Sequence, residues 1–305
     1  MISAELRMTL EDALGDRIRF DVPMAEHTSL GVGGPADALA TPADRADLAL
    51  LLRLCSTCRI PHAVIGGGFN TLVDDGGVEA VMVKLGKLRS VEERPMGGLR
   101  AEAGVSHHRL IRFCIERGLS GLEYGAGIPG SVGGWITMNA GIGTREAVDV
   151  VREIEVMAPS GKRRSHLGIE KLNFGYRSLR GVAPGSVIVS VLFGVSVSTP
   201  AAVRAEVKQT LARRAESQPL DQPSCGSVFK NPPGDFAGRL IESAGLKGER
   251  VGGAQISPVH ANFIVNLGGA TASDVVTLVR RAQERVERAS GIHLEPEVRL
   301  LGRPA

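Results

Sequence analysis

The sequence predicts an α+β protein of about two domains with a site for an anion. With 305 residues, the chain is long enough to bury more than one core. Its β-rich and amphipathic runs do not follow the regular strand–helix repeat of a parallel-sheet protein. Two glycine-rich stretches, at 66–71 and 124–143, lie between these runs, and the second holds seven glycines from residue 125 to residue 143. Such a density of glycine suggests that bare backbone approaches a ligand closely.

The first third of the chain predicts strands around one helix. Strands are expected at 36–40, 62–65 and 78–85, and a helix at 45–58. That helix ends in a C-x-x-C pattern, Cys55 to Cys58, which can form a redox or metal pair. Because the sequence has no second such pair and no histidine pair at a zinc-like interval, we expect the helix to pack on a sheet instead.

In the rest of the chain, residues that cap or terminate helices predict where the helices begin and end. A helix within 104–118 should stop at Gly118, and a helix over 200–217 should end before Pro219. The run 271–290 is amphipathic, with Thr271 or Ser273 available to cap its start and Gly291 its end. Strands are expected at 150–158, 187–197 and 298–301.

Composition and charge argue against nucleic-acid and membrane partners. The formal charge is +3, and the basic residues are scattered among acids, which fits a pocket for a small anionic molecule better than a nucleic-acid surface. No run of about 18 apolar residues could span a membrane. The N-terminus has no apolar signal core, so we expect a cytoplasmic protein.

The glycine stretches are predicted to hold phosphate. Residues 66–71 follow a strand, and Asn70 and Thr71 add short polar side chains. Gly125, Gly127 and Gly130 match the G-x-G-x-x-G fingerprint, but no buried apolar strand precedes them and a proline lies inside the motif. The context therefore favours an extended pyrophosphate-binding loop of another fold, with two loops gripping one dinucleotide diphosphate from two sides.

Three polar segments of the second half are candidates for chemistry. Arg177 stands between turn residues and offers a rigid fork for a carboxylate or phosphate, or an ordinary surface ion pair. Ser227 lies in a proline-rich loop at 223–233 without a local His or Asp, so it is either a proton donor or a turn serine. Glu295 and Glu297 alternate along an extended segment and can point the same way, as buried acids or as solvated ones.

Taken in order, these segments resemble the UDP-N-acetylenolpyruvoylglucosamine reductase family, the flavoenzymes that complete UDP-N-acetylmuramic acid in peptidoglycan synthesis. The passage from Arg177 directly to 181–189 is similar to the shorter, type II form, which lacks a tyrosine-bearing loop. Gly31 stands where the family often has a basic residue. The matching stretches are 27–37, 66–73, 121–141, 174–178, 224–232, 237–266 and 294–302.

The resemblance implies a two-subdomain FAD-binding domain of the vanillyl-alcohol-oxidase (PCMH) type and a C-terminal α+β substrate-binding domain. Residues 1–84 would form the first FAD-binding subdomain and 85–198 the second. Residues 199–297 would bind the UDP-sugar, and residues 298–305 would return to the second FAD-binding subdomain.

The resemblance also implies roles for individual residues. Arg177, Ser227 and Glu297 would be catalytic, with Ser227 as the proton donor. No metal is implied. The substrate would contact Tyr176, Lys230, Asn231, His260 and Asn262. Non-covalent FAD would be held by Gly66, Gly67, Gly68, Asn70, Thr71, Gly125, Gly127, Ile128, Pro129, Gly130, Ser131, Gly133, Gly134, Asn139 and Gly141.

The implied activity is the NADPH-dependent, FAD-mediated reduction of UDP-N-acetylglucosamine enolpyruvate to UDP-N-acetylmuramate. The expected partners are these two small molecules, with no nucleic acid and no membrane, and the expected state is a monomer. Two alternatives stay open. One is an FAD-dependent oxidase of the same fold, and the other is a non-catalytic protein that binds flavin or a UDP-sugar.

Overall fold

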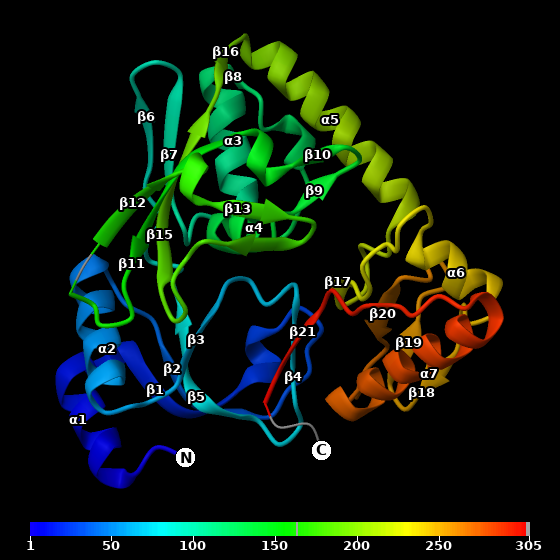
Figure 1. Cartoon of the computed structure of the whole chain (residues 1–305), viewed down its shortest axis with the longest axis horizontal. Helices are drawn as coiled ribbons and strands as arrows, with labels where there is room; N and C mark the ends of the chain where they lie inside the picture. Colours follow the sequence, from blue (N-terminus) through cyan, green and yellow to red (C-terminus); the bar gives the residue numbers. More distant parts are fainter. Residues whose placement is uncertain (163, 303–305) are drawn as a thin grey trace. The chain divides into compact units, whose positions relative to one another are not determined.

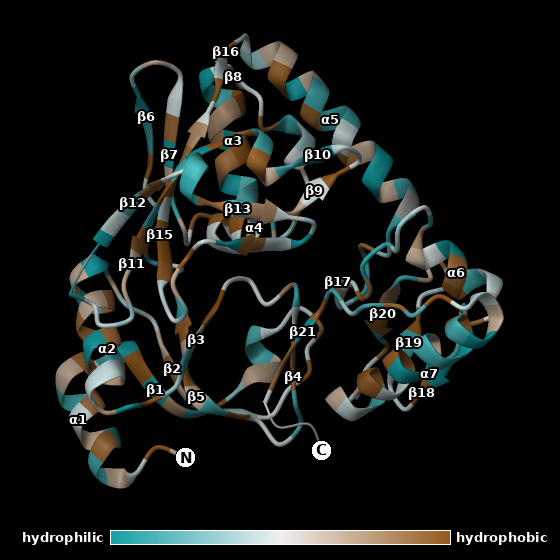
Figure 2. Ribbon diagram, viewed as in Figure 1, coloured by the Kyte–Doolittle hydropathy of each residue, from teal (hydrophilic) through white to brown (hydrophobic). Residues whose placement is uncertain are grey.

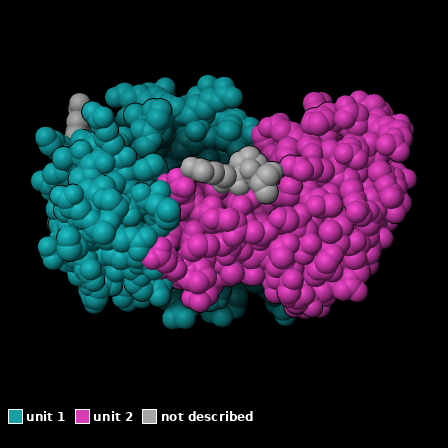
Figure 3. All heavy atoms as spheres, turned by 90° about the horizontal axis from the view of Figure 1, so that it is seen from below, with its two compact units in different colours: residues 1–20, 37–67, 80–213 teal, residues 21–36, 68–79, 214–305 magenta. Residues whose placement is uncertain are grey.

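The computed structural model describes residues 1–162 and 164–302 (Figure 1). The chain forms two compact units, shown in teal and magenta in Figure 3. Unit 1 consists of residues 1–20, 37–67 and 80–213, and unit 2 of residues 21–36, 68–79 and 214–305. Each unit has its own hydrophobic core. Among the described residues, no helix is long and apolar enough to cross a membrane.

A four-stranded sheet and two helices form the first part of unit 1. The strands lie in the order β1 (Ile18–Pro23), β2 (Pro35–Ala40), β5 (Val78–Lys84) and β3 (His62–Ile65), and β3 is parallel to β5. Helix α1 (Ala4–Leu14) packs on α2 (Arg45–Thr57). The predicted strands at 36–40, 62–65 and 78–85 and the helix at 45–58 are thus confirmed. Helix α1 is an addition, because only Leu10 and Leu14 of its residues are buried and its apolar pattern is weak.

Cys55 packs inside α2, as the sequence predicts. Its side chain is buried, and the thiols of Cys55 and Cys58 are free. Burial, with a smaller effect of the neighbouring Cys58, raises the pKa of Cys55 to about 11. Because the thiolate is the reactive form, Cys55 is inert at neutral pH and serves packing.

A five-stranded antiparallel sheet forms the second part of unit 1. Its order is β12 (Arg164–Gly168), β11 (Val151–Met157), β15 (Val187–Gly194), β7 (Gly98–Glu102) and β6 (Val91–Arg94). Side chains alternate between its two faces, and one face is apolar while the other is charged. Helices α3 (His107–Arg117) and α4 (Val132–Thr137) lie on the apolar side, and Figure 2 shows β11 and β15 in the brown of hydrophobic residues. Gly118 ends α3 in the left-handed conformation, as predicted.

Three short antiparallel pairs complete unit 1. These pairs are β8 (Leu119–Ser120) with β16 (Ser196–Val197), β9 (Gly141–Ile142) with β10 (Arg145–Glu146), and β13 (Asn173–Gly175) with β14 (Ser178–Arg180). Helix α5 (Pro200–Ser217) then follows as predicted and ends before Pro219.

Unit 2 packs helices against a four-stranded antiparallel sheet. The strand order is β17 (Ser224–Ser227), β20 (Phe263–Asn266), β19 (Ala254–Ile256) and β18 (Arg250–Val251). Helix α6 (Ala237–Ser243) precedes β18, and α7 (Ala272–Ser290) follows β20. Thr271 caps the start of α7 and Gly291 its end, which confirms the predicted amphipathic helix.

The terminal strand corrects one prediction. Strand β21 (Arg299–Leu301) pairs in parallel with β4 (Thr71–Val73), not with the segment 85–198 to which we expected it to return. The reason lies in burial, because Leu72 belongs to the core of unit 2 together with Leu30 and Val32. Residues 21–36 and 68–79 therefore group with the C-terminal part of the chain, although the sequence order places them in the predicted first subdomain.

Candidate active site

The two glycine stretches meet inside unit 1. Gly66 follows β3, and Ser131 is the N-cap of α4, where its hydroxyl accepts from the amide of Gly134. A Cβ added at Gly66 would lie 2.7 Å from the Ser131 hydroxyl, closer than any real Cβ contact. A side chain at position 66 would have to displace the Ser131 hydroxyl, so Gly66 allows the two loops to approach closely at this junction.

Several glycines of the second stretch serve the protein's own packing. A Cβ at Gly133 would lie 3.0 Å from that of Ala103, and one at Gly141 would lie 2.0 Å from the carbonyl oxygen of Arg145. Gly125 is buried against the ring of His107. The glycine density thus has two causes, close packing and loop exposure. Exposed positions, where backbone can meet a ligand, include Gly67, Gly127, Pro129 and Gly134.

His107, the first residue of α3, fixes the exposed part of the second stretch. Its amide donates to the carbonyl of Gly130, and its ring Nδ1 lies 3.2 Å from the carbonyl oxygen of Ile128. The ring is buried and tilted against Trp135 at a centroid distance of 4.4 Å. A buried aromatic support of this kind holds the loop in one conformation before any ligand arrives.

Asn139, predicted to bind the cofactor, uses its amide on the protein. Its side chain is 1% exposed. The amide donates to Glu146 Oε2 at 2.7 Å and to the carbonyl of Gly175 at 3.1 Å, and its oxygen accepts from the amide of Val148. Asn139 therefore joins the β9–β10 hairpin to the β13–β14 hairpin.

Arg177 stands at the tip of the β13–β14 hairpin. Gly175 pairs with Ser178, so Tyr176 and Arg177 form a two-residue turn. Arg177 has φ 54°, in the left-handed region that costs a non-glycine residue about 1–2 kcal/mol. Such strain at a polar residue is a mark of functional sites. The Arg177 guanidinium lies over the Tyr176 ring at 4.7 Å, and its Nη1 lies 3.7 Å from Glu146 Oε1.

In unit 2, a strand pairing brings the residues that follow Ser227 alongside the segment that contains Glu297. Ser227 ends β17 after an irregularity at Gly226, whose φ is 77°. Bulges re-aim side chains and are common beside active sites. The following residues pair antiparallel with the segment 295–297, since the amide of Glu297 donates to the carbonyl of Val228 and that of Lys230 to the carbonyl of Glu295. Two of the three predicted catalytic residues thus lie on or next to paired segments of one unit.

Asn70 and Thr71, also predicted to bind the cofactor, support this strand pairing. The Asn70 amide donates to the carbonyl of Glu297 at 3.1 Å, and its own carbonyl accepts from Arg299. Thr71 opposes Arg299 in the parallel pair of β4 and β21. The preceding Gly68 is buried and lies against His27 and Thr28, where a side chain would not fit.

Asn262 clamps the chain between Ser227 and Lys230. Its side-chain oxygen accepts from the amide of Phe229 at 2.9 Å, and its side-chain amide donates to the carbonyl of Phe229 at 2.8 Å. The side chain is buried and bonds both backbone groups of Phe229, so it acts as a substitute strand partner. The substrate contact predicted for Asn262 thus has a competing structural role.

The remaining predicted substrate residues surround this clamp. Lys230 Nζ pairs with Glu295, and the Asn231 oxygen accepts from the amide of Ala237 at the start of α6. His260 Nδ1 accepts from the amide of Asn262. Burial, with the Lys247 charge as a smaller cause, lowers the pKa of His260, so the ring is neutral at pH 7.

Cys225 lies behind the site. It is buried, and burial, together with the nearby charge of Glu297, raises the pKa of its thiol to about 12. Cys225 is therefore a packing residue. Among the described residues, no group of three or more His, Cys, Asp or Glu side chains is arranged to hold a metal ion.

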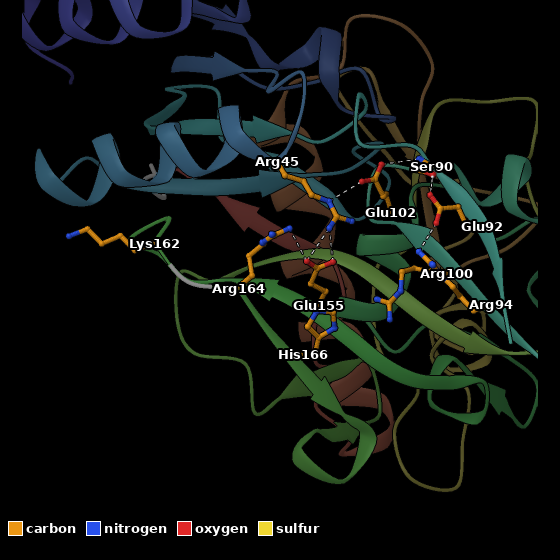
Figure 4. Close-up of a pocket in the computed structure, with 10 residues that line it drawn as sticks. All are labelled: Arg45, Ser90, Glu92, Arg94, Arg100, Glu102, Glu155, Lys162, Arg164 and His166. Atoms are coloured by element: carbon orange, nitrogen blue, oxygen red, sulfur yellow. Dashed lines mark hydrogen bonds and ion pairs between the residues drawn. The ribbon is translucent and has the colours of Figure 1, made fainter. Parts of the chain in front are cut away.

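A separate cavity of about 690 Å³ lies on the charged face of the five-stranded sheet (Figure 4). Glu155 of β11 lies at its centre, where Arg45 and Arg164 both contact its carboxylate. None of the predicted catalytic or cofactor-binding residues lines it. The lining residues are Arg45, Ser90, Glu92, Arg94, Arg100, Glu102, Glu155, Lys162, Arg164 and His166.

Comparison with known proteins defines the class first. A sequence profile described as an FAD binding domain matches residues 36–165, which contain both glycine stretches. A solved glucose dehydrogenase, Phl p 4.0202, shares the fold over 64% of this chain and 44% of its own, with a TM-score of 0.50 and 13% identity. The loop junction at Gly66 and Ser131 is a cradle that a Cβ would fill, so the residues present fit a flavin dinucleotide. The protein is therefore an FAD-binding oxidoreductase.

The family follows from the rest of the chain. The profile of the UDP-N-acetylenolpyruvoylglucosamine reductase C-terminal domain matches residues 218–301. The UDP-N-acetylenolpyruvoylglucosamine reductase of Geobacter metallireducens is 45% identical over 302 residues, 98% of each chain. Reductase 2 of Symbiobacterium thermophilum is 43% identical and covers 99% of this chain and 97% of its own. The solved reductase of Thermus caldophilus has a TM-score of 0.81 and 37% identity over 93% of this chain and 100% of its own.

The chain belongs to the UDP-N-acetylenolpyruvoylglucosamine reductase family. The predicted fold class, an FAD-binding domain of the vanillyl-alcohol-oxidase type with a C-terminal α+β domain, is confirmed by these matches. Sequence reasoning missed the supporting roles of Glu146, Asn262 and Asn70. Each acts through hydrogen bonds or charge between loops that are distant in sequence, and no local sequence pattern predicts such partners.

Proposed function

We propose that this protein uses NADPH to reduce UDP-N-acetylglucosamine enolpyruvate to UDP-N-acetylmuramate, a step of peptidoglycan precursor synthesis, as a cytoplasmic monomer. The observation that supports this most directly is the strand pairing in unit 2. Ser227 follows the irregularity at Gly226, and the next residue, Val228, pairs with Glu297. A proton donor and an acid on adjacent strands suit a substrate that must gain one proton.

FAD, which the backbone of the two glycine stretches would hold, would supply hydride transfer from NADPH to C3 of the enolpyruvyl group. The protein's part is to stabilise the electron pair that this addition leaves on C2 and the substrate carboxylate. Arg177 offers a planar fork of N–H donors for that enediolate, and Glu297, in its protonated form, donates a hydrogen bond to the same group. A preorganised donor of this kind contributes about 3–4 kcal/mol to stabilising the transition state.

Ser227 completes the reaction by holding the proton that C2 receives. Its Oγ–H bond breaks as the C2–H bond forms, which yields the lactyl ether, and solvent then restores the serine proton. The hydroxyl stays in place because the Asn262 clamp and the pairing with residues 295–297 fix the backbone after it. General acid–base help of this kind contributes roughly 100- to 10,000-fold in rate.

The proposed cofactor contacts lie in unit 1, and most of the proposed substrate contacts lie in unit 2. We assign the FAD pyrophosphate to the junction of Gly66 with Ser131 and to the exposed backbone of the second glycine stretch. Lys230, Asn231 and His260 are proposed contacts of the UDP-sugar in unit 2, and Tyr176 is one in unit 1. Asn262 and Asn139 are assigned to the support of these residues, because their side chains bond the protein.

The test is a spectroscopic separation of the two half-reactions. The purified full chain should be yellow, lose its flavin absorbance when NADPH is added anaerobically, and regain it rapidly on mixing with the enolpyruvyl sugar. Rapid recovery with oxygen and none with the sugar would instead indicate an oxidase. A colourless protein that takes up no FAD, or a flavin that NADPH cannot bleach, would overturn the proposal.

A further inference from the structure

Glu146 is held from several directions next to Arg177. Its carbonyl accepts from the Tyr124 hydroxyl at 2.7 Å, and its amide donates to Asp149 in a capping box. Its Oε2 accepts from the Asn139 amide at 2.7 Å. Both the backbone and one carboxylate oxygen are therefore fixed, and the other oxygen, Oε1, is the one nearest to Arg177.

Asn139 makes this arrangement rigid. It is almost fully buried, has φ 41°, and its amide bridges Glu146 and the carbonyl of Gly175. Gly175 is the last residue of β13 before the turn that carries Arg177. One buried side chain thus sets the distance between the carboxylate and the turn.

The distance between the two charged groups determines what Glu146 does. At 3.7 Å, Nη1 of Arg177 and Oε1 of Glu146 attract each other by charge but do not form a hydrogen bond. The guanidinium is 18% exposed and the carboxylate 29%, so solvent screens this attraction only in part. The carboxylate can therefore hold the guanidinium in place without engaging these atoms in a hydrogen bond.

We propose that Glu146, fixed by Asn139, is a positioning residue for Arg177. Its carboxylate keeps the guanidinium over the Tyr176 ring at the hairpin tip, in the orientation that meets the substrate's carboxylate. This inference rests on the catalytic role of Arg177 proposed above.

The first test removes the negative charge of Glu146 and keeps the shape of its side chain. Glu146→Gln keeps an oxygen for the Asn139 amide but loses the attraction for Arg177. We expect flavin reduction by NADPH to stay within twofold of the unchanged enzyme, and flavin reoxidation by the enolpyruvyl sugar to slow about 10-fold. Glu92→Gln, at an exposed glutamate paired with Arg94 in the same unit, is the matched control and should change neither rate. A Glu146→Gln enzyme with an unchanged reoxidation rate would overturn the inference.

A double-mutant cycle separates this inference from the function beneath it. Arg177→Ala should slow reoxidation strongly, and adding Glu146→Gln to it should cause no further loss. If Arg177→Ala has no effect, the proposed role of Arg177 itself is wrong. If Arg177→Ala slows the reaction and Glu146→Gln costs the same factor in both backgrounds, Arg177 keeps its role and the positioning role of Glu146 is wrong.

A measurement independent of turnover reports the guanidinium directly. The Nε–H signal of Arg177, assigned by its absence in Arg177→Lys, should have a high NMR order parameter in the FAD-loaded protein. The order parameter should fall in Glu146→Gln and not in Glu92→Gln. Equal thermal stability and flavin content of the two variants would show that both are folded, and an unchanged order parameter in Glu146→Gln would count against the proposal.

Discussion

At the scale of single residues, the candidate site depends on side chains that hold other parts of the chain in place. Asn262 fixes the backbone beyond Ser227, Asn70 fixes the carbonyl of Glu297, and Asn139 fixes Glu146. An amide has both a donor and an acceptor, so one asparagine can satisfy two backbone groups that would otherwise lack partners. Asparagine therefore supplies the support at all three of these positions.

Ser227→Ala should separate the two half-reactions. Flavin reduction by NADPH does not need the serine proton and should stay nearly intact. Flavin reoxidation by the enolpyruvyl sugar should slow by about 100- to 10,000-fold, the range that general acid–base catalysis supplies. Stopped-flow absorbance of the flavin measures both steps. Equal losses in the two steps would remove Ser227 from its proposed role.

The sequence predicted the roles of individual site residues only through its resemblance to a known family. Ser227 has no His or Asp nearby in the chain, and Arg177 is one of many arginines. The structure adds physical marks to both, namely the bulge before Ser227 and the left-handed backbone of Arg177. These marks depend on strand pairing and torsion angles, which the sequence does not display.

At the scale of elements, the junction of the two glycine loops can be tested by adding one methyl group. Gly66→Ala should lower the affinity for FAD about 10-fold or more, because its Cβ would collide with the Ser131 hydroxyl that caps α4. Gly86→Ala is the matched control, since a Cβ there meets nothing within 4 Å. Fluorescence titration of the apoprotein with FAD measures both variants. Equal affinities would show that the junction is not part of the cofactor site.

The start of α7 provides a pH-dependent test. The carboxylate of Asp75 accepts from the amides of Ala272 and Ser273 and from the Ser273 hydroxyl. Burial raises the pKa of Asp75, but these hydrogen bonds outweigh burial and hold the pKa below its ordinary value. The bonds also place negative charge at the positive end of the helix.

Asp75→Ala should therefore lower the free energy of unfolding by about 1 kcal/mol at pH 7, the usual cost of losing a helix cap. A lowered pKa stabilises the fold above the unfolded-state value near 3.9 and loses that effect as the pH falls through the folded-state value. The difference between the two proteins should thus vanish in strong acid. Urea unfolding across this pH range measures it, and a difference that persists in acid would contradict the assignment.

Elements were the part of the fold that sequence predicted best. Strong periodicity and terminating residues gave α2, α3, α5 and α7 close to their observed bounds. The partner of the terminal strand was predicted wrongly, because a parallel pair between β4 and β21 leaves no trace in local sequence. The prediction that the glycine-rich stretches serve ligand contact was incomplete, because Gly133 and Gly141 also allow the protein to pack closely on itself.

At the scale of the whole molecule, stability rests on two cores and on a buried charge network. Glu155 of unit 1 has a side chain that is 4% exposed, and it accepts from Arg45, Arg164 and Ser190, which lie on α2, β12 and β15. The network thus ties three elements of unit 1 to β11. A buried carboxylate with several partners cannot be removed without leaving those partners unpaired.

Glu155→Ala should lower the free energy of unfolding by about 3 kcal/mol. Glu92→Ala, which removes an exposed carboxylate of the same sheet face, should change it by less than about 0.5 kcal/mol. Chemical denaturation followed by circular dichroism compares the two variants. Similar losses in both would mean that the Glu155 network contributes no more than a surface ion pair.

The pairing of β4 with β21 also bears on how the protein is made. Asn70 and Glu297 are 227 positions apart, so Leu72 leaves the ribosome roughly 10–45 s before its partner strand is synthesised. The five-stranded sheet of unit 1 is complete at residue 194, and its segments can pair while translation continues. Strand β4 of unit 2 must wait until residues 299–301 are synthesised, and until then an apolar strand of the nascent chain stays exposed. During that interval, the nascent chain would have the greatest need of a chaperone to cover this exposed strand.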